Sequence, residues 1–355
     1  MKKITCLIIG FLLCGMSVLA ENLVIESFDS AGQITFNHIT NATSYRVEWA
    51  PSPGEPWQSS WSALRHIPAP ISGSVTCSVA MCYRVVAELG IVMVRVPAGS
   101  NAGTNPLGTV WGNPETYSQS YPENYSLTVD SFYMDATAIT KTQWDQVYNW
   151  AMDHGYIFDN PGSGKDENHP VHSVSWYDCV KWCNARSQRD GLTPCYTVSN
   201  SVYKTGQSIP DCDFNVTGYR LPKTDEWEYA ARGGLGSQRY PWGNTITHSN
   251  GTYFSHDKYD YDVSSTRGSH PDYHILSSPF TSPVGIFEPN GYGLHGMANN
   301  MMTWCWEPSY TTARHNRGGA STMYAESARC GRINWNSATD SEVYLGLRAV
   351  RRWFP

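Results

Sequence analysis

The sequence predicts an α+β protein of two modules: a small all-β sandwich over residues 21–88, followed by a loop-rich mixed domain over residues 91–355. Residues 21–88 hold short runs of alternating apolar and polar residues divided by Asn, Gly, Pro and Ser, which is the pattern of antiparallel strands. The 355-residue chain has 30 Gly, 21 Pro and 13% aromatic residues. That composition is typical of a loop-rich globular protein with packed rings and argues against a helical bundle.

Residues 1–20 have the three parts of a secretory signal: Lys2 and Lys3, an apolar run, and a small-residue cleavage site that ends at Ala20. The apolar run is too short to span a membrane, and no other segment is suited to do so. Cys14 raises the alternative of a lipoprotein, but the leucines before it are larger than that signal accepts. We therefore expect cleavage after Ala20 and a protein that is secreted, periplasmic or held at the cell surface.

The predicted export bears on the cysteines, and the net charge bears on the partners. Eight of the 10 cysteines lie beyond residue 20, and an even number in an exported chain favours disulfides. Cys195 and Cys212 flank a polar loop, so they are predicted to pair. A net charge of -6 without runs of like charge argues against binding to nucleic acid or to an anionic membrane.

The alternating pattern predicts strands throughout the first module. In ATSYRVEWA (residues 42–50), Tyr45, Val47 and Trp49 share one face, because successive side chains of a strand point to opposite sides. The module resembles a fibronectin type III domain, and we expect Trp49 and Tyr83 in its core. It contains no arrangement of residues suited to catalysis.

Three helices are expected in the second module. Thr140 caps the first, and Ser175 opens the second with a capping box. The third follows Pro222, and Thr224 and Asp225 are placed to accept hydrogen bonds from its first free N–H groups. Gly233 and Gly234 are expected to end it. Its apolar face has the spacing i, i+3, i+4: Trp227, Ala230 and Ala231.

The segment around the third helix carries a family resemblance. GYRLPKTDEWEYAARGGLGSQRYPWGN (residues 218–244) resembles the signature of the formylglycine-generating enzyme family, also called the sulfatase-modifying-factor family. Further blocks agree in the family's order: MVRVPAG (93–99), VDSFYMDATAITKTQWDQV (129–147), HPVHSVSWYDCVKWCNAR (169–186), SPVGIFEPNGYGL (282–294), RGGA (317–320) and GLRAVR (346–351). The resemblance covers residues 91–351 and implies a fold related to C-type lectins, with little regular secondary structure.

The resemblance implies a chemistry whose reactive groups are absent here. Formylglycine-generating enzymes oxidise a cysteine of a sulfatase, using oxygen and a copper ion held by two cysteines, because Cu(I) is soft and prefers thiolates. Those cysteines follow an R-G-G-S motif, in which Ala320 replaces the serine. The two cysteine positions are Met323 and Ala328, and Cys305 and Cys330 are the possible substitutes. We therefore expect no catalytic residues and no copper.

The resemblance also implies structural calcium. At one family site Gly296 replaces the acidic or amide residue, and Thr303 replaces the glutamate. Two strong oxygen ligands are therefore lost, and we expect no ion there. The other family site begins at Asn250 and Gly251, where we predict calcium. Three nearby acids are available to complete it: Asp260, Asp262 and Asp272. The alternative is that these residues only form turns.

The remaining residues of the C-terminal segment suit binding. Tyr324, Trp335 and Asn336 offer flat apolar surfaces and amide groups, and we expect them to line a ligand pocket, with Trp304 in the core. The sequence thus favours a non-catalytic protein that binds a peptide, protein or glycan. Two alternatives remain: a formylglycine-generating oxidase, and a ligand-display protein diversified by a retroelement.

Overall fold

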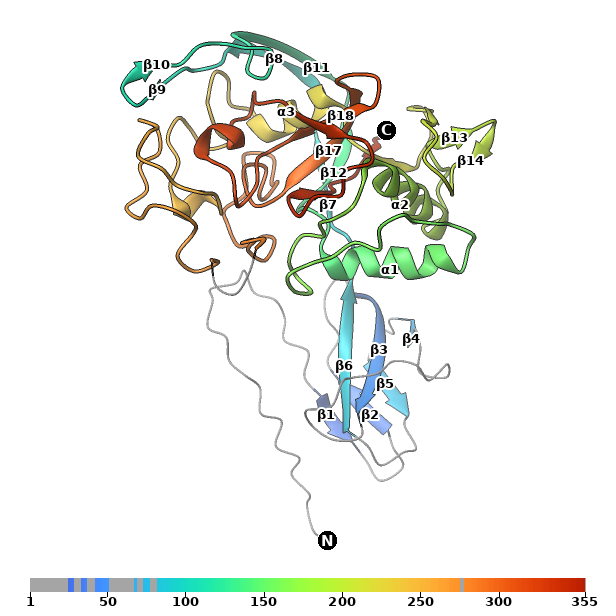
Figure 1. The fold of residues 1–355 in the computed structure, drawn as a ribbon. Helices are drawn as coiled ribbons and strands as arrows, with labels where there is room; N and C mark the ends of the chain where they lie inside the picture. The colour runs from blue at the N-terminus through green and yellow to red at the C-terminus, as the bar shows by residue number, and fades with distance from the viewer. Residues whose placement is uncertain are drawn as a thin grey trace, which may run out of the picture. The chain divides into compact units, whose positions relative to one another are not determined.

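The structure of the protein, a computed structural model, describes residues 90–274 and 278–354 and, before them, six strands between residues 25 and 89. The chain forms two compact units, residues 1–90 and residues 91–355 (Figure 1). The predicted signal sequence with its cleavage after Ala20, and Cys77, lie outside the described residues.

The described part of the first unit is all-β and consists of two antiparallel three-stranded sheets. One sheet has the order β1 (Ile25–Phe28), β2 (Gln33–Phe36), β5 (Gly73–Thr76), and the other the order β4 (Ile67–Pro68), β3 (Ala42–Ala50), β6 (Cys82–Leu89). In the second sheet Trp49 lies opposite Tyr83 in register. The side chains of these two residues, and so their predicted place in a core, are outside what the structure describes.

Two four-stranded sheets organise the second unit. One has the order β16 (Tyr219–Arg220), β21 (Val350–Arg352), β12 (Phe132–Asp135), β7 (Met93–Val96), so the last strand of the chain pairs with both β12 and β16. The other has the order β19 (Asn334–Ser337), β18 (Ala313–Arg317), β17 (Met302–Pro308), β20 (Leu345–Gly346), with β17 and β20 parallel. Strands far apart in sequence therefore meet in both sheets.

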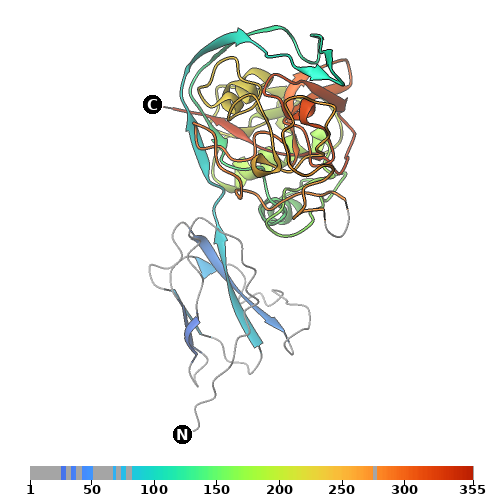
Figure 2. The ribbon, with the colours of Figure 1, turned by 90° about the vertical axis from the view of Figure 1, so that its left-hand side faces the viewer.

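Three smaller sheets complete this mixed α+β unit. β8 (Gly99–Thr104) pairs with β11 (Asn124–Val129), and β9 (Thr109–Val110) pairs with β10 (Asn113–Pro114). These two ribbons run along the rim of the unit in both views (Figures 1 and 2). The third sheet has the order β14 (Ser201–Val202), β13 (Tyr196–Val198), β15 (Asp211–Cys212).

The first two helices begin at the caps that the sequence predicts. Thr140 Oγ1 accepts from the Gln143 N–H before α1 (Lys141–Met152), and Ser175 Oγ accepts from the Asp178 N–H before α2 (Trp176–Arg189). The two helices pack through stacked indoles, Trp144 and Trp182, whose ring centroids are 5.6 Å apart. Both rings are fully buried and belong to the same apolar core cluster.

The third helix, α3 (Thr224–Arg232), is capped differently from the prediction. Glu226 accepts from the Lys223 N–H at 2.8 Å, and Glu307 of β17 accepts from the Thr224 N–H at 2.7 Å. The carboxylates of Glu226, in the first turn of the helix, and of Glu307, in β17, therefore accept in place of Thr224 and Asp225. Gly233, at φ +57°, ends the helix as predicted, because only glycine adopts this conformation without strain.

The six cysteines between residues 90 and 354 are free thiols, including Cys195 and Cys212, which the sequence predicted to be paired. Cys212 lies opposite Tyr196, and the Asp213 N–H donates to the Cys195 carbonyl, so the two cysteines are offset by one position. Both side chains nevertheless pack against the same apolar core cluster, which contains Trp182. The loop between them is closed by strand pairing instead.

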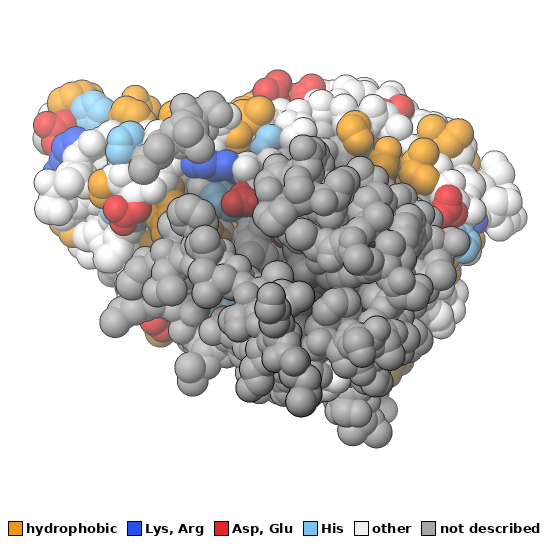
Figure 3. Space-filling view, turned by 90° about the horizontal axis from the view of Figure 1, so that it is seen from below, with side chains coloured by type: hydrophobic (Ala, Val, Ile, Leu, Met, Phe, Trp, Pro, Cys, Tyr) orange, Lys and Arg blue, Asp and Glu red, His pale blue; other side chains and the backbone are white. Residues whose placement is uncertain are grey.

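Two surface features bear on partners. Among the described residues, no helix combines the length and the apolar character needed to cross a membrane. On the face shown in Figure 3, the visible described residues have acidic, basic and histidine side chains scattered among hydrophobic ones.

Candidate ligand-binding site

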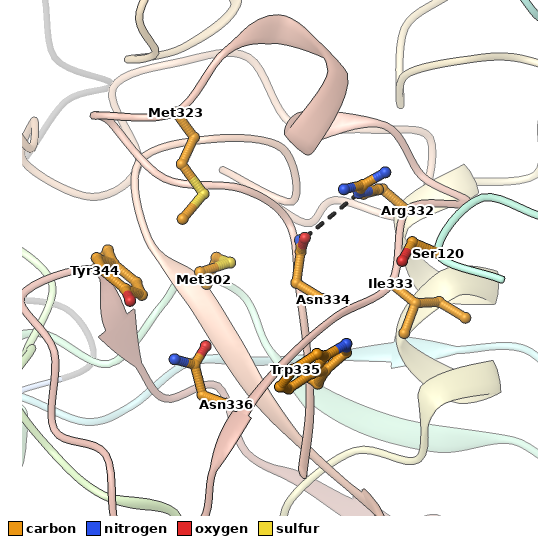
Figure 4. A pocket seen from close by; sticks show the side chains of 9 residues that line it. All are labelled: Ser120, Met302, Met323, Arg332, Ile333, Asn334, Trp335, Asn336 and Tyr344. Atoms are coloured by element: carbon orange, nitrogen blue, oxygen red, sulfur yellow. Dashed lines mark hydrogen bonds between the residues drawn. The ribbon is translucent and has the colours of Figure 1, made fainter. Parts of the chain in front are cut away.

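A pocket of about 280 Å³ lies against the sheet formed by β17, β18, β19 and β20. The turn after β18 contains Gly318 and Gly319, with φ of +100° and +70°. A Cβ on Gly319 would lie 2.9 Å from the Ser327 backbone, so only glycine lets the following segment fold back so closely. Nine residues line the pocket (Figure 4): Ser120, Met302, Met323, Arg332, Ile333, Asn334, Trp335, Asn336 and Tyr344.

The apolar side of the pocket consists of thioether and aromatic groups. The side chain of Met323 points toward that of Met302, and the ring of Tyr344 lies beside them (Figure 4). At one side, Trp335 is 52% exposed and packs edge-to-face with Tyr310, which is 60% exposed. Large aromatic rings with this much exposure are suited to contact a ligand.

The polar side is held by a short network of amides. The Asn316 amide donates to Asn336 Oδ1 at 3.0 Å, and the Asn336 amide donates to Asp340 Oδ2 at 3.2 Å. Both ends of the Asn336 side chain are thus occupied, which fixes its orientation. Arg332 Nε donates to Asn334 Oδ1 at 3.4 Å, while Asn334 Nδ2 has no partner among the described residues.

The structure brings together two of the three residues predicted to bind a ligand. Trp335 and Asn336 line the pocket, but Tyr324 does not. Tyr324 lies in a separate aromatic group, edge-to-face with Phe254 at 5.6 Å and under the Lys258 ammonium at 3.6 Å. Trp304 is fully buried in the core, as predicted.

The sequence gave no signal for Ser120 or Tyr344. Ser120 comes from the loop between β10 and β11, and it reaches the pocket because its carbonyl accepts from the Ile333 N–H at 2.8 Å. Tyr344 precedes the short parallel strand β20, and its carbonyl accepts from the Met302 N–H at 3.1 Å. Both residues are placed by long-range backbone pairing, which local spacing does not reveal.

A family model described as the sulfatase-modifying factor enzyme 1-like domain matches residues 87–353. The chain belongs to this family. This sulfatase-modifying-factor protein is 28% identical to the chaperone protein LppX of Paenibacillus barcinonensis, over 76% of this chain and 98% of that protein. It is 25% identical to the formylglycine-generating enzyme of Mus musculus, over 74% of this chain and 76% of that enzyme.

Among solved structures, the crystal structure of CarF has the same fold. Its TM-score is 0.55 at 23% identity, and the match covers 75% of this chain and 99% of that chain. This likeness supports the mixed α+β fold of the family that the sequence predicted.

The residues present do not fit the two-thiolate copper site of the family's enzymes. Ala328, at one cysteine position, is buried and has no ligand atom, and Met323, at the other, has only a thioether. Cys305 and Cys330 are buried in a separate apolar cluster with Trp227 and do not line the pocket. Burial raises the pKa of Cys305 well above its usual range and that of Cys330 to about 12, so both stay protonated thiols.

The calcium predicted at Asn250 and Gly251 stays a prediction, and the side chains there are already engaged. Asn250 Oδ1 accepts from the Thr247 N–H at 3.0 Å as part of a cap. Asp262 accepts from the Tyr253 hydroxyl at 2.6 Å, the His256 N–H at 2.9 Å and Arg267 at 3.2 Å. Among the described residues, no group of three or more His, Cys, Asp or Glu side chains is placed to hold a metal.

Proposed function

We propose that this protein is an exported, non-catalytic member of the sulfatase-modifying-factor family that binds a peptide, protein or glycan through the pocket beside Trp335. The observation that carries this proposal is the replacement of both copper-binding cysteine positions, by Met323 and Ala328. The scaffold around these positions is retained, because the glycine turn and the arginine that precedes it are present and ordered.

The replacement removes the redox chemistry for a physical reason. A thiolate binds Cu(I) as a charged, soft ligand, whereas a thioether is neutral and a methyl group donates nothing. Cys305 and Cys330 do not substitute, because they are buried away from the pocket and remain protonated. The pocket therefore has no pair of reactive thiols at the predicted copper positions.

The pocket keeps features that favour binding. Exposed aromatic rings stand beside amide and guanidinium groups, which is the usual combination at sites that recognise peptides and sugars. The relative called LppX carries the name of a chaperone. That name supports a polypeptide as one class of ligand.

The catalytic alternative is tested by mass spectrometry. The purified protein, loaded with copper under oxygen, is incubated with a peptide that carries the sulfatase motif C-x-P-x-R, beside a formylglycine-generating enzyme as a positive control. We expect the peptide cysteine to keep its mass with this protein and to change with the control. Formylglycine in the first sample would refute the proposal.

Binding is tested with peptide and glycan arrays and two matched variants. Trp335→Ala removes the exposed ring of the pocket (52%), and Trp111→Ala removes a more exposed tryptophan (64%) from the turn between β9 and β10, outside the pocket. We expect array signals of the wild type to be lost in Trp335→Ala and kept in Trp111→Ala. Equal signals from both variants would place the binding surface elsewhere.

A related proposal concerns the first unit. Its two three-stranded sheets have the strand pairing β1-β2-β5 and β4-β3-β6, which supports a fibronectin type III-like sandwich acting as a spacer or docking module. Expression of residues 21–90 alone, followed by circular dichroism and thermal unfolding, tests it. A chain without a cooperative transition would refute an independently folded module.

A further inference from the structure

We propose that the pocket recognises a carboxylate joined to an apolar group, as in an N-acylated amino acid or at the C-terminus of a polypeptide. This inference rests on the proposed binding function and assigns the chemical class of the ligand. Three features carry it: the open guanidinium of Arg332, the unpartnered amide of Asn334, and the apolar side formed by Met302 and Met323.

The first feature is the Arg332 guanidinium, which has no acidic partner among the described residues. Arg332 makes one side-chain hydrogen bond within the described residues, from Nε to Asn334 Oδ1, and no salt bridge. Two arginines that precede it are paired with acids, Arg317 with Glu228 at 2.7 Å and Arg329 with Glu115. Arg314 and Arg348 instead donate from their terminal nitrogens to backbone carbonyls. The terminal nitrogens of Arg332 are thus left as a planar pair of donors, the geometry that binds carboxylates best.

The second feature is a donor whose direction is determined. Arginine has only N–H donors, so the atom of Asn334 that faces Arg332 must be the oxygen Oδ1. Nδ2 has no partner among the described residues. Asn316, opposite Asn334 in the strand register, has an unpartnered Oδ1, but Asn316 does not line the pocket. An unpaired donor on a pocket-lining residue therefore favours an acceptor on the ligand.

Together, the Arg332 guanidinium and the Asn334 amide N–H favour a ligand group that only accepts hydrogen bonds. A carboxylate has two oxygens and no hydrogen to donate, so it pairs with both the guanidinium and the amide N–H. A ligand ammonium or amide N–H would face donors on both sides. The nearest acid of the network, Asp340, is already engaged by the Asn336 amide at 3.2 Å and the Ser337 N–H at 3.0 Å.

The third feature sets what the carboxylate is attached to. Figure 4 shows Met302, Met323 and Tyr344 across the pocket from Arg332, with Asn334 between them. A volume of about 280 Å³ is at the low end for ligand pockets, which suits a single residue or a small acid. The ligand then places its apolar part on the thioethers and its charge at Arg332.

The test uses the two methionines as reporters. Protein labelled with [methyl-¹³C]methionine is titrated with N-acetyl-leucine, with N-acetyl-leucinamide, and with acetyl-Ala-Ala-Leu as its free acid. The resonances are assigned with Met302→Leu and Met323→Leu. We expect both acids or one of them to shift the two methyl signals saturably, and the amide to bind at least about tenfold more weakly. The tripeptide acid distinguishes a polypeptide terminus from a small acid.

Arg332→Gln is the decisive variant, and Arg352→Gln is its control, since Arg352 lies on β21 in the other sheet and contacts Asn215. We expect Arg332→Gln to abolish the difference between acid and amide, with the remaining methionine signals unmoved, and Arg352→Gln to keep it. Equal binding of acid and amide to the wild type, or no shift with any probe, would overturn the carboxylate assignment. The array experiment with Trp335→Ala decides the proposed function separately.

Discussion

Two aromatic pairs of the second unit show how the same residue types serve different ends. Trp144 and Trp182 are stacked at 5.6 Å and fully buried, and each indole N–H donates to a backbone carbonyl, of Pro161 and Trp144 respectively. Trp335 and Tyr310 are packed edge-to-face at 5.3 Å, and more than half of each is exposed. The first pair holds two helices together, whereas the second faces solvent beside a pocket. Burial and hydrogen bonding, not residue type, separate structural from binding aromatics.

The largest expected effect is on the buried pair. Trp182→Ala removes the stacking partner of Trp144 and leaves a cavity at the contact of α1 and α2. We expect the free energy of unfolding to fall by about 3–5 kcal/mol. Chemical denaturation with Trp182→Phe as the control measures it. A loss no greater than that of Trp182→Phe would show that the stack is not central.

An intermediate effect is expected for the buried ion pair at the start of α3. Burial alone would raise the pKa of Glu226, but the Arg220 guanidinium, at 2.6 and 2.7 Å, more than offsets it and holds the pKa below its usual value. The charged form therefore stabilises the fold above the unfolded pKa of about 4.5, and this contribution is lost as pH falls through the lower folded pKa.

Glu226→Gln tests this contribution. We expect the free energy of unfolding near neutral pH to fall by about 1–3 kcal/mol, and its decline below pH about 4.5 to become less steep. Glu342→Gln, at an exposed position, serves as the control and should leave both quantities unchanged. An acid decline as steep in Glu226→Gln as in the wild type would assign the pH dependence to other groups.

The smallest effect on stability is expected at the pocket. Trp335→Ala removes a half-exposed ring, so the free energy of unfolding should change by no more than about 0.5 kcal/mol while ligand binding is lost. Thermal unfolding and the array signal, measured on the same preparation, check both parts. A loss of several kcal/mol would make Trp335 a core residue and erase its contrast with Trp182.

Much of the fold could be predicted from local sequence. The caps Thr140 and Ser175 lie where the pattern placed them, and Gly233 ends α3 as expected. The motif blocks identified the family, and its model matches residues 87–353. These features depend on a few neighbouring residues, so the sequence contains them directly.

The candidate site was predicted less completely. Trp335 and Asn336 line the pocket, but Tyr324 turns toward Phe254 and Lys258, although it is adjacent to Met323 in the sequence. Neighbouring residues outside regular strands point in directions that only their packing decides. The same limit applies to Cys195 and Cys212, which pack against the same core cluster as free thiols and not as a disulfide.

The sequence by itself determined the family, through motif blocks that the family model over residues 87–353 matches, and it predicted Met323 and Ala328 at the positions of the family's cysteine pair. Only the tertiary structure decided that Cys305 and Cys330 lie in the core, away from the pocket, and that Arg332, beside Asn334, has no acid partner among the residues that the structure describes. Burial and charge pairing depend on segments far apart in the chain, such as the loop in which the Ser120 carbonyl accepts from the Ile333 N–H next to β19. Local sequence pattern therefore does not predict them.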